Sequence, residues 1–383
     1  MSSSAFIVSA VRTPVGVGKP EKGALYPVAP VDLAAQVLSE ALLRGGLQPT
    51  HVDDVILGCV TPIGDQGANI GRLAALKAGF PVEVPGIQIN RMCGSGQQAV
   101  HFAAQAILAG DMDVIIAGGI EMMSHQPIGA DWPENWPDDF PHDLVHQGLS
   151  AELMAEKWAL DREALDEYAF QSHQRAAAAI REGRQERQIT PVRVRQVQGE
   201  DQWVEHDEGV RMQPDREKMR SLSPVFKEGG VITAANSSQI SDGAAALLVV
   251  SEKALKQHKL TPMARVVAHA VVGSDPVLML DAPIPATQMV LEKAGTRLDQ
   301  IGLIEINEAF ASVVLAWMSE IEPDPEIVNP DGGAIAHGHP LGATGAVLMT
   351  KLVHEIDHYN VRYGLQTMCI GHGMATATIL ERV

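Results

Sequence analysis

One succession of predicted strands and helices occurs twice along this chain, at an offset of roughly 250 residues. In each half, short apolar stretches alternate with stretches of helical periodicity, and a glycine-rich turn lies in the middle. The stretches predicted as strands or helices are 6–11, 31–43, 54–60, 100–109 and 113–119 in the first half and 264–272, 286–294, 303–307, 345–356, 366–371 and 375–380 in the second. Such alternation forms βαβ units with helices on both faces of a sheet, and the offset is far too long for a solenoid. The pattern therefore predicts an α/β protein built from two duplicated halves.

A segment of different composition, at 120–251, separates the two halves. It contains a stretch rich in proline, tryptophan and acidic residues at 131–141, which is typical of a loop, and a long polar stretch of predicted helix at 152–187. An exposed helical face would explain much of its charge, but an insertion in this place is also suited to cover an active site and bind a substrate. We therefore divide the chain into an N-terminal half at 1–119, an inserted loop domain at 120–251 whose last part returns to the N-terminal half, and a C-terminal half at 252–383.

Charge and cysteine content narrow the classes of protein. The formal net charge of −18 argues against a nucleic-acid surface, since phosphate binding needs a basic face. Three cysteines form no disulfide framework, which fits a reducing compartment. The N-terminus shows no secretory signal, and no apolar run approaches the ~20 residues of a membrane helix. We expect a cytoplasmic protein without membrane insertion; an organelle matrix stays open as an alternative.

Cys93 ends the apolar stretch before the first glycine-rich turn and precedes a predicted helix. A thiol there lies near the helix N-terminus, where unpaired N–H groups favour the thiolate, and small neighbours let a substrate approach the backbone. An ordinary thiol with a pKa near ~8.5 is only slightly ionised at pH 7, so a nucleophilic Cys93 would need this help or a nearby base. The alternative is a buried structural cysteine, which is the usual fate of this residue type.

Four loops, at 90–96, 307–311, 332–342 and 369–374, carry residue types suited to catalysis. They read Asn-Arg-x-Cys-Gly-Ser-Gly, Asn-Glu-Ala-Phe-Ala, Gly-Gly-Ala-Ile-Ala-x-Gly-His-Pro-x-Gly and Cys-Ile-Gly-x-Gly-Met. In this order they resemble the thiolases (acetyl-CoA C-acyltransferases), and the resemblance covers essentially the whole chain. It implies the thiolase fold, in which the duplicated βαβ-type halves form five layers, α-β-α-β-α, and carry an inserted loop domain.

The resemblance also implies a reaction and a role for each loop. Thiolases reversibly cleave a 3-oxoacyl-CoA with free CoA, giving acetyl-CoA and an acyl-CoA two carbons shorter, by a ping-pong route through an acyl-cysteine and without a metal. Cys93 matches the nucleophile, His339 its base, and Cys369 the acid or base at the leaving carbon. Asn307, through a water, and His339 would stabilise the enolate oxygen, while the N–H groups of Cys93 and Gly371 would stabilise the thioester oxyanion.

Each of these residues also has a plainer interpretation. Cys369 could serve only core packing, and Asn307 could be a helix N-cap. The glycines of 332–345 could serve only turn geometry. No one of these alternatives explains why the whole set recurs together.

Coenzyme A is the co-substrate that the resemblance implies, and no permanently bound cofactor is expected. Arg211 resembles the arginine that binds the nucleotide, and Ser238 resembles the serine that meets the pantetheine arm. His146 and Gln147 correspond to the segment near the acyl pocket, and Phe310 belongs to the Asn-Glu-Ala-Phe-Ala loop. A surface arginine such as Arg211 is otherwise simply a solvated charge.

Some positions depart from the commonest family pattern. His372 and Ala375 replace glycines, and His337 stands where an aliphatic residue is common. The spacing of these histidines and the cysteines matches no usual zinc site, so no metal is expected. We expect His372 to tune the proton of Cys369 or to occupy part of the acyl channel. Gln147 in place of a methionine argues against a pocket for acetoacetyl-CoA only and favours a degradative bacterial thiolase, including those acting on steroid side chains.

Other functions remain as alternatives. A biosynthetic thiolase that forms acetoacetyl-CoA would use the same residues. A decarboxylating ketoacyl synthase shares the duplicated fold and the cysteine nucleophile but commonly has two active-site histidines, and a catalytically silent CoA-binding protein is the rival that is no enzyme. The resemblance further implies a homodimer or a homotetramer.

Overall fold

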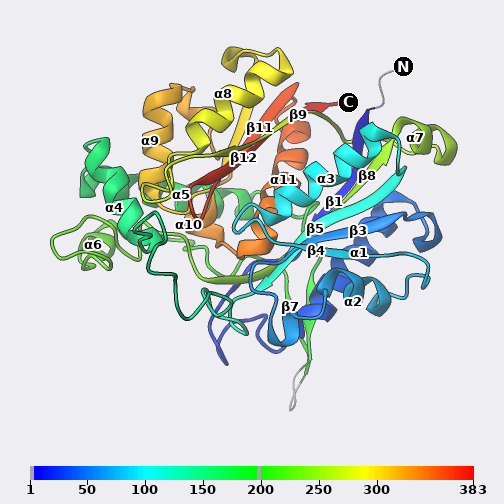
Figure 1. Cartoon of the computed structure of the whole chain (residues 1–383), viewed down its shortest axis with the longest axis horizontal. Coiled ribbons are helices and arrows are strands. Elements are labelled where there is room, and N and C mark those ends of the chain that lie inside the picture. The colour runs from blue at the N-terminus through cyan, green and yellow to red at the C-terminus, as the bar shows by residue number, and fades with distance from the viewer. Residues whose placement is uncertain (1–3, 196–199) are drawn as a thin grey trace.

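The computed structural model describes residues 4–195 and 200–383, so the first three residues of the predicted N-terminal half lie outside the described residues. In this part of the chain, ten strands form one sheet (Figure 1). Nine of them follow the order β10-β11-β12-β9-β1-β8-β5-β3-β4, and β2 lies off this path and pairs with β8. These strands are β1 (Ala5–Arg12), β2 (Gly16–Val17), β3 (Asp54–Gly58), β4 (Ile87–Ile89), β5 (Val114–Met122), β8 (Ser241–Ser251), β9 (Ala264–Gly273), β10 (Leu303–Ile306), β11 (Tyr363–Ile370) and β12 (Met374–Arg382). A separate hairpin consists of β6 (Val192–Val194) and β7 (Gln202–Val204).

Helices cover the sheet path or form the insertion. They are α1 (Pro30–Gly45), α2 (Ile70–Lys77), α3 (Ser95–Ala109), α4 (Gln147–Lys157), α5 (Arg162–Arg181), α6 (Arg216–Arg220), α7 (Glu252–His258), α8 (Pro283–Ala294), α9 (Ala311–Ile321), α10 (Ala334–His337) and α11 (Leu341–His358). Short 3-10 turns lie at 49–51, 64–66, 298–300 and 325–327.

The two halves repeat one pairing pattern. In the N-terminal half, β3 and β5 are parallel, and β5·β8 and β8·β1 are antiparallel. In the C-terminal half, β10 and β11 are parallel, and β11·β12 and β12·β9 are antiparallel. The halves meet where β1 pairs with β9 over only two residue pairs, Phe6–Arg265 and Ile7–Ala264. The duplication predicted from the sequence is therefore present in the topology.

Helices α3 and α11 occupy the same place in the two halves and lie against each other between the sheets (Figure 1). Their backbones touch: a Cβ on Gly96 would lie 2.7 Å from the Ala346 nitrogen, and one on Gly345 would collide with Gln97. Only glycine allows so close an approach. Alanines on both helices, such as Ala103 and Ala343, fill the same core.

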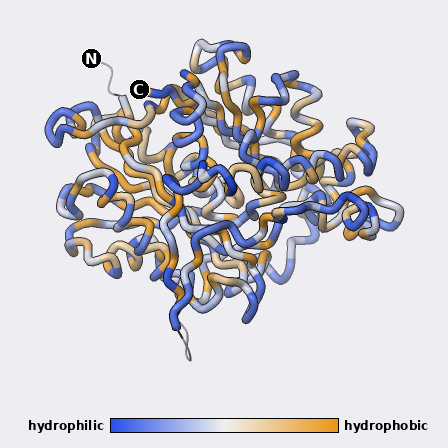
Figure 2. Tube along the Cα trace, turned by 180° about the vertical axis from the view of Figure 1, so that it is seen from behind, coloured by the Kyte–Doolittle hydropathy of each residue, from blue (hydrophilic) through white to orange (hydrophobic). Residues whose placement is uncertain are grey.

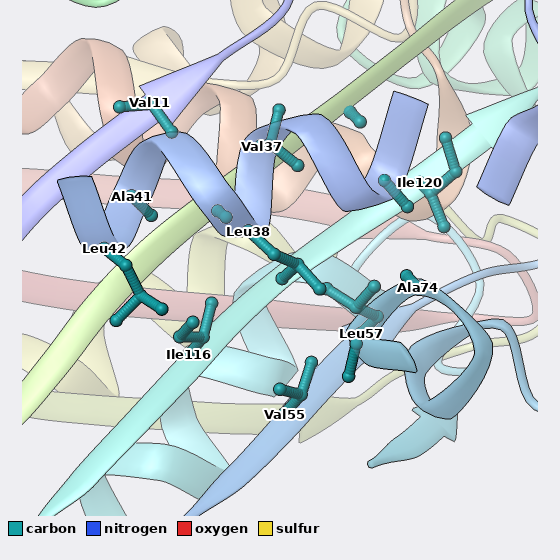
Figure 3. Close-up of a cluster of buried hydrophobic side chains, with 14 of the residues drawn as sticks. Val11, Val37, Leu38, Ala41, Leu42, Val55, Leu57, Ala74, Ile116 and Ile120 are labelled. Carbon is teal, nitrogen blue, oxygen red and sulfur yellow. The ribbon is translucent and has the colours of Figure 1, made fainter. Parts of the chain in front are cut away.

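The other face of each half is closed by its own helices. Leu38 and Leu42 of α1 pack with Val55, Leu57 and Ile116 of the N-terminal strands (Figure 3), and α8 and α9 cover the C-terminal strands. Hydrophobic stretches follow the strands, whereas the outer loops are mostly hydrophilic (Figure 2). The order α1/α2, strands, α3/α11, strands, α8/α9 gives five α-β-α-β-α layers, as the resemblance predicted.

The insertion differs from its prediction in one respect. The polar stretch at 152–187 is two helices, α4 and α5, because Asp161 caps a new helix by accepting a hydrogen bond from the Ala164 N–H at 2.8 Å. Helix α5 is also not simply an exposed face, since Leu165, Ala169 and Phe170 are buried. Strand β8, at the end of the predicted insertion, pairs with β5 and β1 of the N-terminal half.

Candidate active site

Cys93 lies in a tight turn between β4 and α3. Met92, directly before it, has a φ of +46°, a conformation that L-residues rarely adopt. Two side chains hold this turn: Asn90 Oδ1 accepts a hydrogen bond from the Met92 N–H at 2.8 Å, and Ser95 Oγ donates to the Met92 carbonyl at 2.6 Å. The residues around the cysteine in this motif thus impose a strained backbone that places Cys93 one residue before Gly94, the N-cap of α3.

The Cys93 thiol is buried, with 5% of the residue exposed. Its sulfur accepts hydrogen bonds from the Gly371 N–H and from the side chain of Gln147, the first residue of α4. Burial nevertheless raises the pKa of Cys93 to about 11, and these two hydrogen bonds, together with one from its own N–H, only oppose that rise. In the free protein, burial raises the Cys93 pKa in spite of the nearby helix N-terminus, which was expected to lower it. Cys93 therefore needs a base to become a thiolate.

His339, between α10 and α11, has the state that a base requires. Its Nδ1 lies 2.6 Å from Thr344 Oγ1, and that hydroxyl donates its hydrogen to the Pro340 carbonyl at 2.8 Å. The hydrogen between the ring and Thr344 therefore belongs to Nδ1, and Nε2 carries the free lone pair. Burial lowers the pKa of His339 to about 4, so the imidazole is neutral at pH 7.

Asn307 follows β10 and faces this lone pair. Its Nδ2 lies 3.5 Å from His339 Nε2, and its buried Oδ1 has no protein partner among the described residues. The alternative of a helix N-cap is wrong, because α9 begins at Ala311 and its N-cap is Phe310. An unpaired buried amide oxygen is suited to accept a hydrogen bond from a water.

Cys369 is the next-to-last residue of β11, and the tight turn after the strand carries Gly371. Cys369 is buried, and its pKa is raised far above the ordinary value, first by burial and then by the neighbouring Cys93. The structure therefore brings the two thiols near each other. His372 in the turn has a φ of +63°, which explains why glycine is usual there and why the histidine is a departure.

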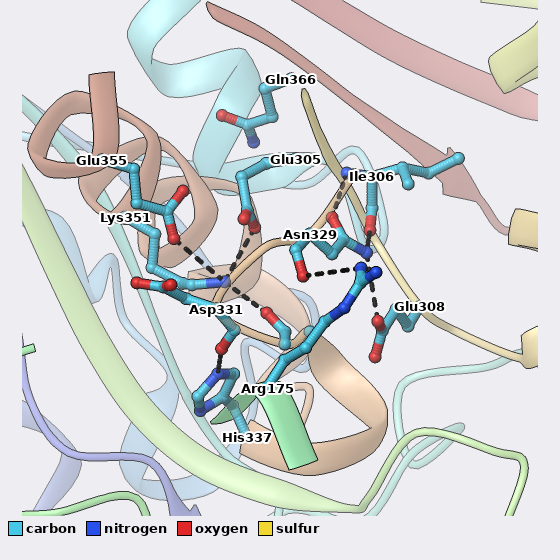
Figure 4. Close-up of polar contacts among 12 residues, drawn as sticks. Arg175, Glu305, Ile306, Glu308, Asn329, Asp331, His337, Lys351, Glu355 and Gln366 are labelled. Atoms are coloured by element: carbon cyan, nitrogen blue, oxygen red, sulfur yellow. Dashed lines mark hydrogen bonds and ion pairs between the residues drawn. The ribbon is translucent and has the colours of Figure 1, made fainter. Parts of the chain in front are cut away.

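A polar network that the sequence argument missed lies beneath this site (Figure 4). Asn329 holds the end of β10: its Oδ1 accepts from the Ile306 N–H, and its Nδ2 donates to the Ile306 carbonyl, both at 2.9 Å. Buried Glu308 accepts from Tyr168, Ser172 and the Ile335 N–H. The sequence signal for this network was Glu308 in the Asn-Glu-Ala-Phe-Ala loop, because a carboxylate that becomes buried needs hydrogen-bond partners.

Glu121 at the end of β5 is a second buried carboxylate beside the site. It accepts hydrogen bonds from the N–H groups of Val60 and Gly342 at 2.7 and 2.9 Å, and from the Gln66 side chain at 3.0 Å. Burial raises the pKa of Glu121. Through Gly342 it joins the N-terminal half to the first turn of α11, two residues after Pro340.

The residues predicted to bind coenzyme A lie on the insertion side of the site. Arg211 lines a cavity of about 520 Å³ together with Lys218, Gln239 and Ile335. The ring of His146, the N-cap of α4, stacks on Phe226 with centroids 5.2 Å apart. Other predicted contacts adjoin this region: Phe226 meets Phe310 at 6.0 Å, and the Ser238 N–H donates to the Ala309 carbonyl at 2.9 Å.

The tryptophan-rich loop of the insertion reaches the catalytic turn. The ring centroids of Trp132 and Trp136 lie 6.0 and 6.5 Å from that of His372. Both tryptophans remain partly exposed, at 41% and 44%. An apolar wall with open aromatic faces thus borders the turn that carries Gly371.

The part of the chain that the structure describes has neither a metal-binding cluster of side chains nor a membrane-spanning helix. Within residues 4–195 and 200–383, no three His, Cys, Asp or Glu side chains are grouped so as to bind a metal ion. No helix in the part of the chain that the structure describes combines the length and apolarity needed to cross a bilayer.

The lowered pKa of His339 predicts how activity depends on pH. Burial keeps the imidazole of His339 neutral down to about pH 4, so if His339 is the base, as the resemblance implies, kcat/KM should change by less than about 1.5-fold between pH 7 and pH 5. A histidine with the ordinary pKa of about 6.5 would instead lose about 25-fold over this range. Initial rates across the range, with circular dichroism to confirm that the protein stays folded, measure the difference. A steep fall between pH 7 and pH 6 would contradict the assignment.

Comparison with known proteins identifies the family. The model of the thiolase N-terminal domain matches residues 5–253, and that of the thiolase C-terminal domain matches residues 260–382. A steroid 3-ketoacyl-CoA thiolase, FadA6, from Mycobacterium tuberculosis is 48% identical over 100% of this chain and 95% of its own length. A 3-ketoacyl-CoA thiolase from Pseudoalteromonas translucida is 42% identical over 98% of both chains. The crystal structure of the Bacillus anthracis acetyl-CoA acetyltransferase superposes with a TM-score of 0.92 and 37% identity, covering 100% of this chain and 99% of that one. The chain belongs to the thiolase family.

Proposed function

We propose that this protein is a degradative thiolase that cleaves a 3-oxoacyl-CoA with CoA, through an acyl group on Cys93. The observation that carries the proposal is the pair of neighbouring buried thiols, Cys93 and Cys369, whose loops pack against Leu341, two residues after the neutral His339. One thiol can be acylated while the other handles the proton at carbon. The names of the two 3-ketoacyl-CoA thiolase relatives support the same reaction.

In the first half-reaction, His339 Nε2 takes the Cys93 proton, and the thiolate attacks the 3-oxo carbon of the substrate. The bond between C2 and C3 then breaks, and its electron pair leaves as the enolate of acetyl-CoA. Cys369 protonates C2 of this enolate, so the step ends with acyl-Cys93, an imidazolium ion and a Cys369 thiolate. The high pKa of Cys369 keeps its proton in place until the enolate needs it.

In the second half-reaction, the Cys369 thiolate takes the thiol proton of incoming CoA. The CoA sulfur attacks the acyl group, and the leaving Cys93 thiolate recovers its proton from His339. Both half-reactions build negative charge on oxygen. The Gly371 N–H, which already meets the Cys93 sulfur, and the Cys93 N–H are the donors for the thioester oxyanion, while His339 and a water on Asn307 serve the enolate.

Coenzyme A would enter beside the insertion. The cavity near Arg211 holds two cations, Arg211 and Lys218, which can offset the phosphates in a protein of net charge −18. Gln239 lines this cavity, and its carbonyl accepts a hydrogen bond from the His339 N–H at 3.1 Å. One residue of the cavity wall is therefore hydrogen-bonded directly to the backbone of the proposed base. Ser238, His146 and Phe310 would border the pantetheine arm along the way.

The acyl group of the substrate is bulky and apolar in this proposal. Trp132, Trp136 and His372 would form the wall that it meets, and Gln147 would hold the Cys93 sulfur and leave the pocket open. The relative named steroid 3-ketoacyl-CoA thiolase supports a ring-shaped acyl group. The alternative is acetoacetyl-CoA synthesis, which the acetyl-CoA acetyltransferase neighbour keeps open.

Shortening Trp132 tests the acyl wall. Trp132→Ala should lower kcat/KM for a ring-bearing 3-oxoacyl-CoA by about tenfold and change that for acetoacetyl-CoA by less than about twofold, because only the bulky group reaches the ring. Trp203→Ala, at an exposed tryptophan of the β6–β7 hairpin, is the matched control and should change neither. An equal loss on both substrates would remove the acyl wall from the proposal.

His372→Gly should show the same preference shift; superimposable pH–rate profiles and chain-length preferences would exclude a role for His372.

The function itself is tested by offering the protein 3-oxoacyl-CoAs of graded length and shape, with and without CoA. Mass spectrometry should then find the shortened acyl group on Cys93 when CoA is absent and free shortened acyl-CoA when it is present. Turnover of a malonyl thioester alone would instead indicate a decarboxylating synthase. Absence of any acyl-enzyme with every substrate would overturn the proposal.

The remaining assignments rest on the same resemblance. We infer a homodimer or homotetramer in the cytoplasm, with coenzyme A as the co-substrate and no resident cofactor. The division into halves at 1–119 and 252–383 around an insertion at 120–251 also stays a prediction.

A further inference from the structure

We propose that His337 is a positioning residue: a buried imidazolium ion that fixes the loop of the base His339 to Asp207 of the insertion. His337 ends α10, two residues before His339, and only 3% of it is exposed. The family resemblance gives this position no role, since an aliphatic residue is common there. The catalytic part of the inference rests on the proposed function, whereas the charge state does not.

Both ring nitrogens of His337 face atoms that can only accept a hydrogen bond. Nε2 lies 2.9 Å from the Asp331 carbonyl oxygen, and Nδ1 lies at ion-pair distance, 2.8 Å, from Asp207 Oδ2, although the direction of this contact is not that of a hydrogen bond. A carbonyl oxygen has no hydrogen to give, so Nε2 must carry one. The same holds for Nδ1 as long as Asp207 is ionised. With a hydrogen on both nitrogens, the ring is a cation.

The surroundings of Asp207 keep that carboxylate ionised. Its Oδ1 accepts from Arg12 Nη1 at 2.7 Å and from the Val15 N–H at 2.8 Å, and its Oδ2 accepts from Arg12 Nη2 at 3.0 Å. Burial raises the pKa of Asp207, but the Arg12 charge and the neighbouring His337 outweigh it and hold the pKa far below the ordinary value. Two cations thus share one buried carboxylate, and each is also held by other groups.

The backbone connects the contact between His337 and Asp207 to His339, the proposed base. After His337 the chain passes through Gly338, whose φ is +108° and whose Cα is so close to Ser241 that a Cβ would collide with its hydroxyl. The next N–H, that of His339, donates to Ser241 Oγ at 3.1 Å. The backbone between His337 and His339 is therefore tightly packed, so that a shift of His337 would move His339. On its other side, Asp331 belongs to the polar network beneath the site (Figure 4).

His337 also faces the region proposed to bind coenzyme A. The pKa of His173 on α5 is lowered to about 4 by burial, by Arg211 and by His337, in that order. The Arg211 N–H donates to Nδ1 of this neutral ring at 3.1 Å. Asp207 precedes Arg211 by four residues, so the contact between His337 and Asp207 lies close to the start of the proposed nucleotide loop.

Two measurements test the inference. In the intact protein labelled with ¹⁵N-histidine, the His337 signals, assigned by their loss in His337→Leu, should show hydrogens on both nitrogens at pH 7. His337→Leu should lower kcat for thiolysis by about tenfold or more, because the base is misplaced, while the KM for CoA stays within about twofold. Without CoA, where the acyl-enzyme is not turned over, the burst should be slower, but its final amplitude should stay near one acyl group per subunit.

Controls separate this role from general stability. His354→Leu removes a partly buried histidine whose Nε2 lies 3.0 Å from the Ala10 carbonyl oxygen, and it should leave kcat unchanged. If His337→Leu does not fold, His337→Gln, which keeps one donor, supplies the assignment and the rate. A neutral His337, or a burst amplitude that falls in proportion to kcat, would overturn the inference. Absence of a burst in the wild-type protein would instead count against the proposed function. The ¹⁵N-histidine spectrum would then still test the charge state of His337.

Discussion

Replacing Cys93 by alanine is expected to lower kcat for thiolysis by about 10⁴-fold or more, since no other group in the site can carry the acyl chain. The loss should exceed that of any other single substitution in the site. The Gly371 N–H and the Gln147 side chain would lose the atom that they hold, but a cavity of one sulfur costs little beyond about 1–2 kcal/mol of the free energy of unfolding. Steady-state rates and thermal unfolding on the same samples separate the two effects.

Cys59→Ala is the matched control for this experiment. Cys59 is also fully buried, and its sulfur lies 4.0 Å from Glu121 Oε1, where burial followed by that carboxylate raises its pKa far above the ordinary value. It is a structural thiol, and its loss should change kcat by less than about twofold while costing similar stability. Comparable loss of activity in both variants would mean that the damage comes from packing and not from chemistry.

Cys369→Ala should separate the two half-reactions. Thiolysis needs a proton delivered to C2, so kcat should fall by about 10³-fold, within the usual range for removal of a general acid. Transfer of an acyl group between acyl-CoA and labelled CoA breaks no C–C bond. Cys369 there only takes the thiol proton of CoA, which water can also take because an ordinary thiol ionises near pH ~8.5, so this transfer should lose only about tenfold. Isotope exchange measures the second reaction on the same sample. Equal losses in both assays would show that Cys369 acts by holding Cys93 and not as the acid.

Much of the fold could be predicted from the sequence because hydrophobic periodicity is local. The strand at 6–11 and the helix at 100–109 lie within β1 and α3, and the duplication and five layers are confirmed. The break between α4 and α5 was missed, since it depends on one cap, Asp161, inside a uniformly polar stretch. Patterns read over ten or more residues do not resolve such a local signal.

The site was predictable as a set of residues but not as an electrostatic environment. Cys93 packs with Leu341, Met368 and Ile370, and Asn307 lies 3.5 Å from His339, so the four loops adjoin one another; the roles of their residues stay a proposal. The rise in the Cys93 pKa follows from burial by segments far along the chain, which no local pattern reports. The same is true of Glu308 and Asn329, whose partners on α5 and β10 are known only once the chain is folded.

The contact between α3 and α11 has a consequence for how this protein unfolds. The sequence repeats, yet neither half can close its own core, because each central helix buries its alanines and glycines against the other one. A separated half would expose that face to water, and the seam of two residue pairs between β1 and β9 is too short to replace it. The duplicated chain is therefore one cooperative unit, and it should unfold in a single thermal transition although it consists of two similar halves.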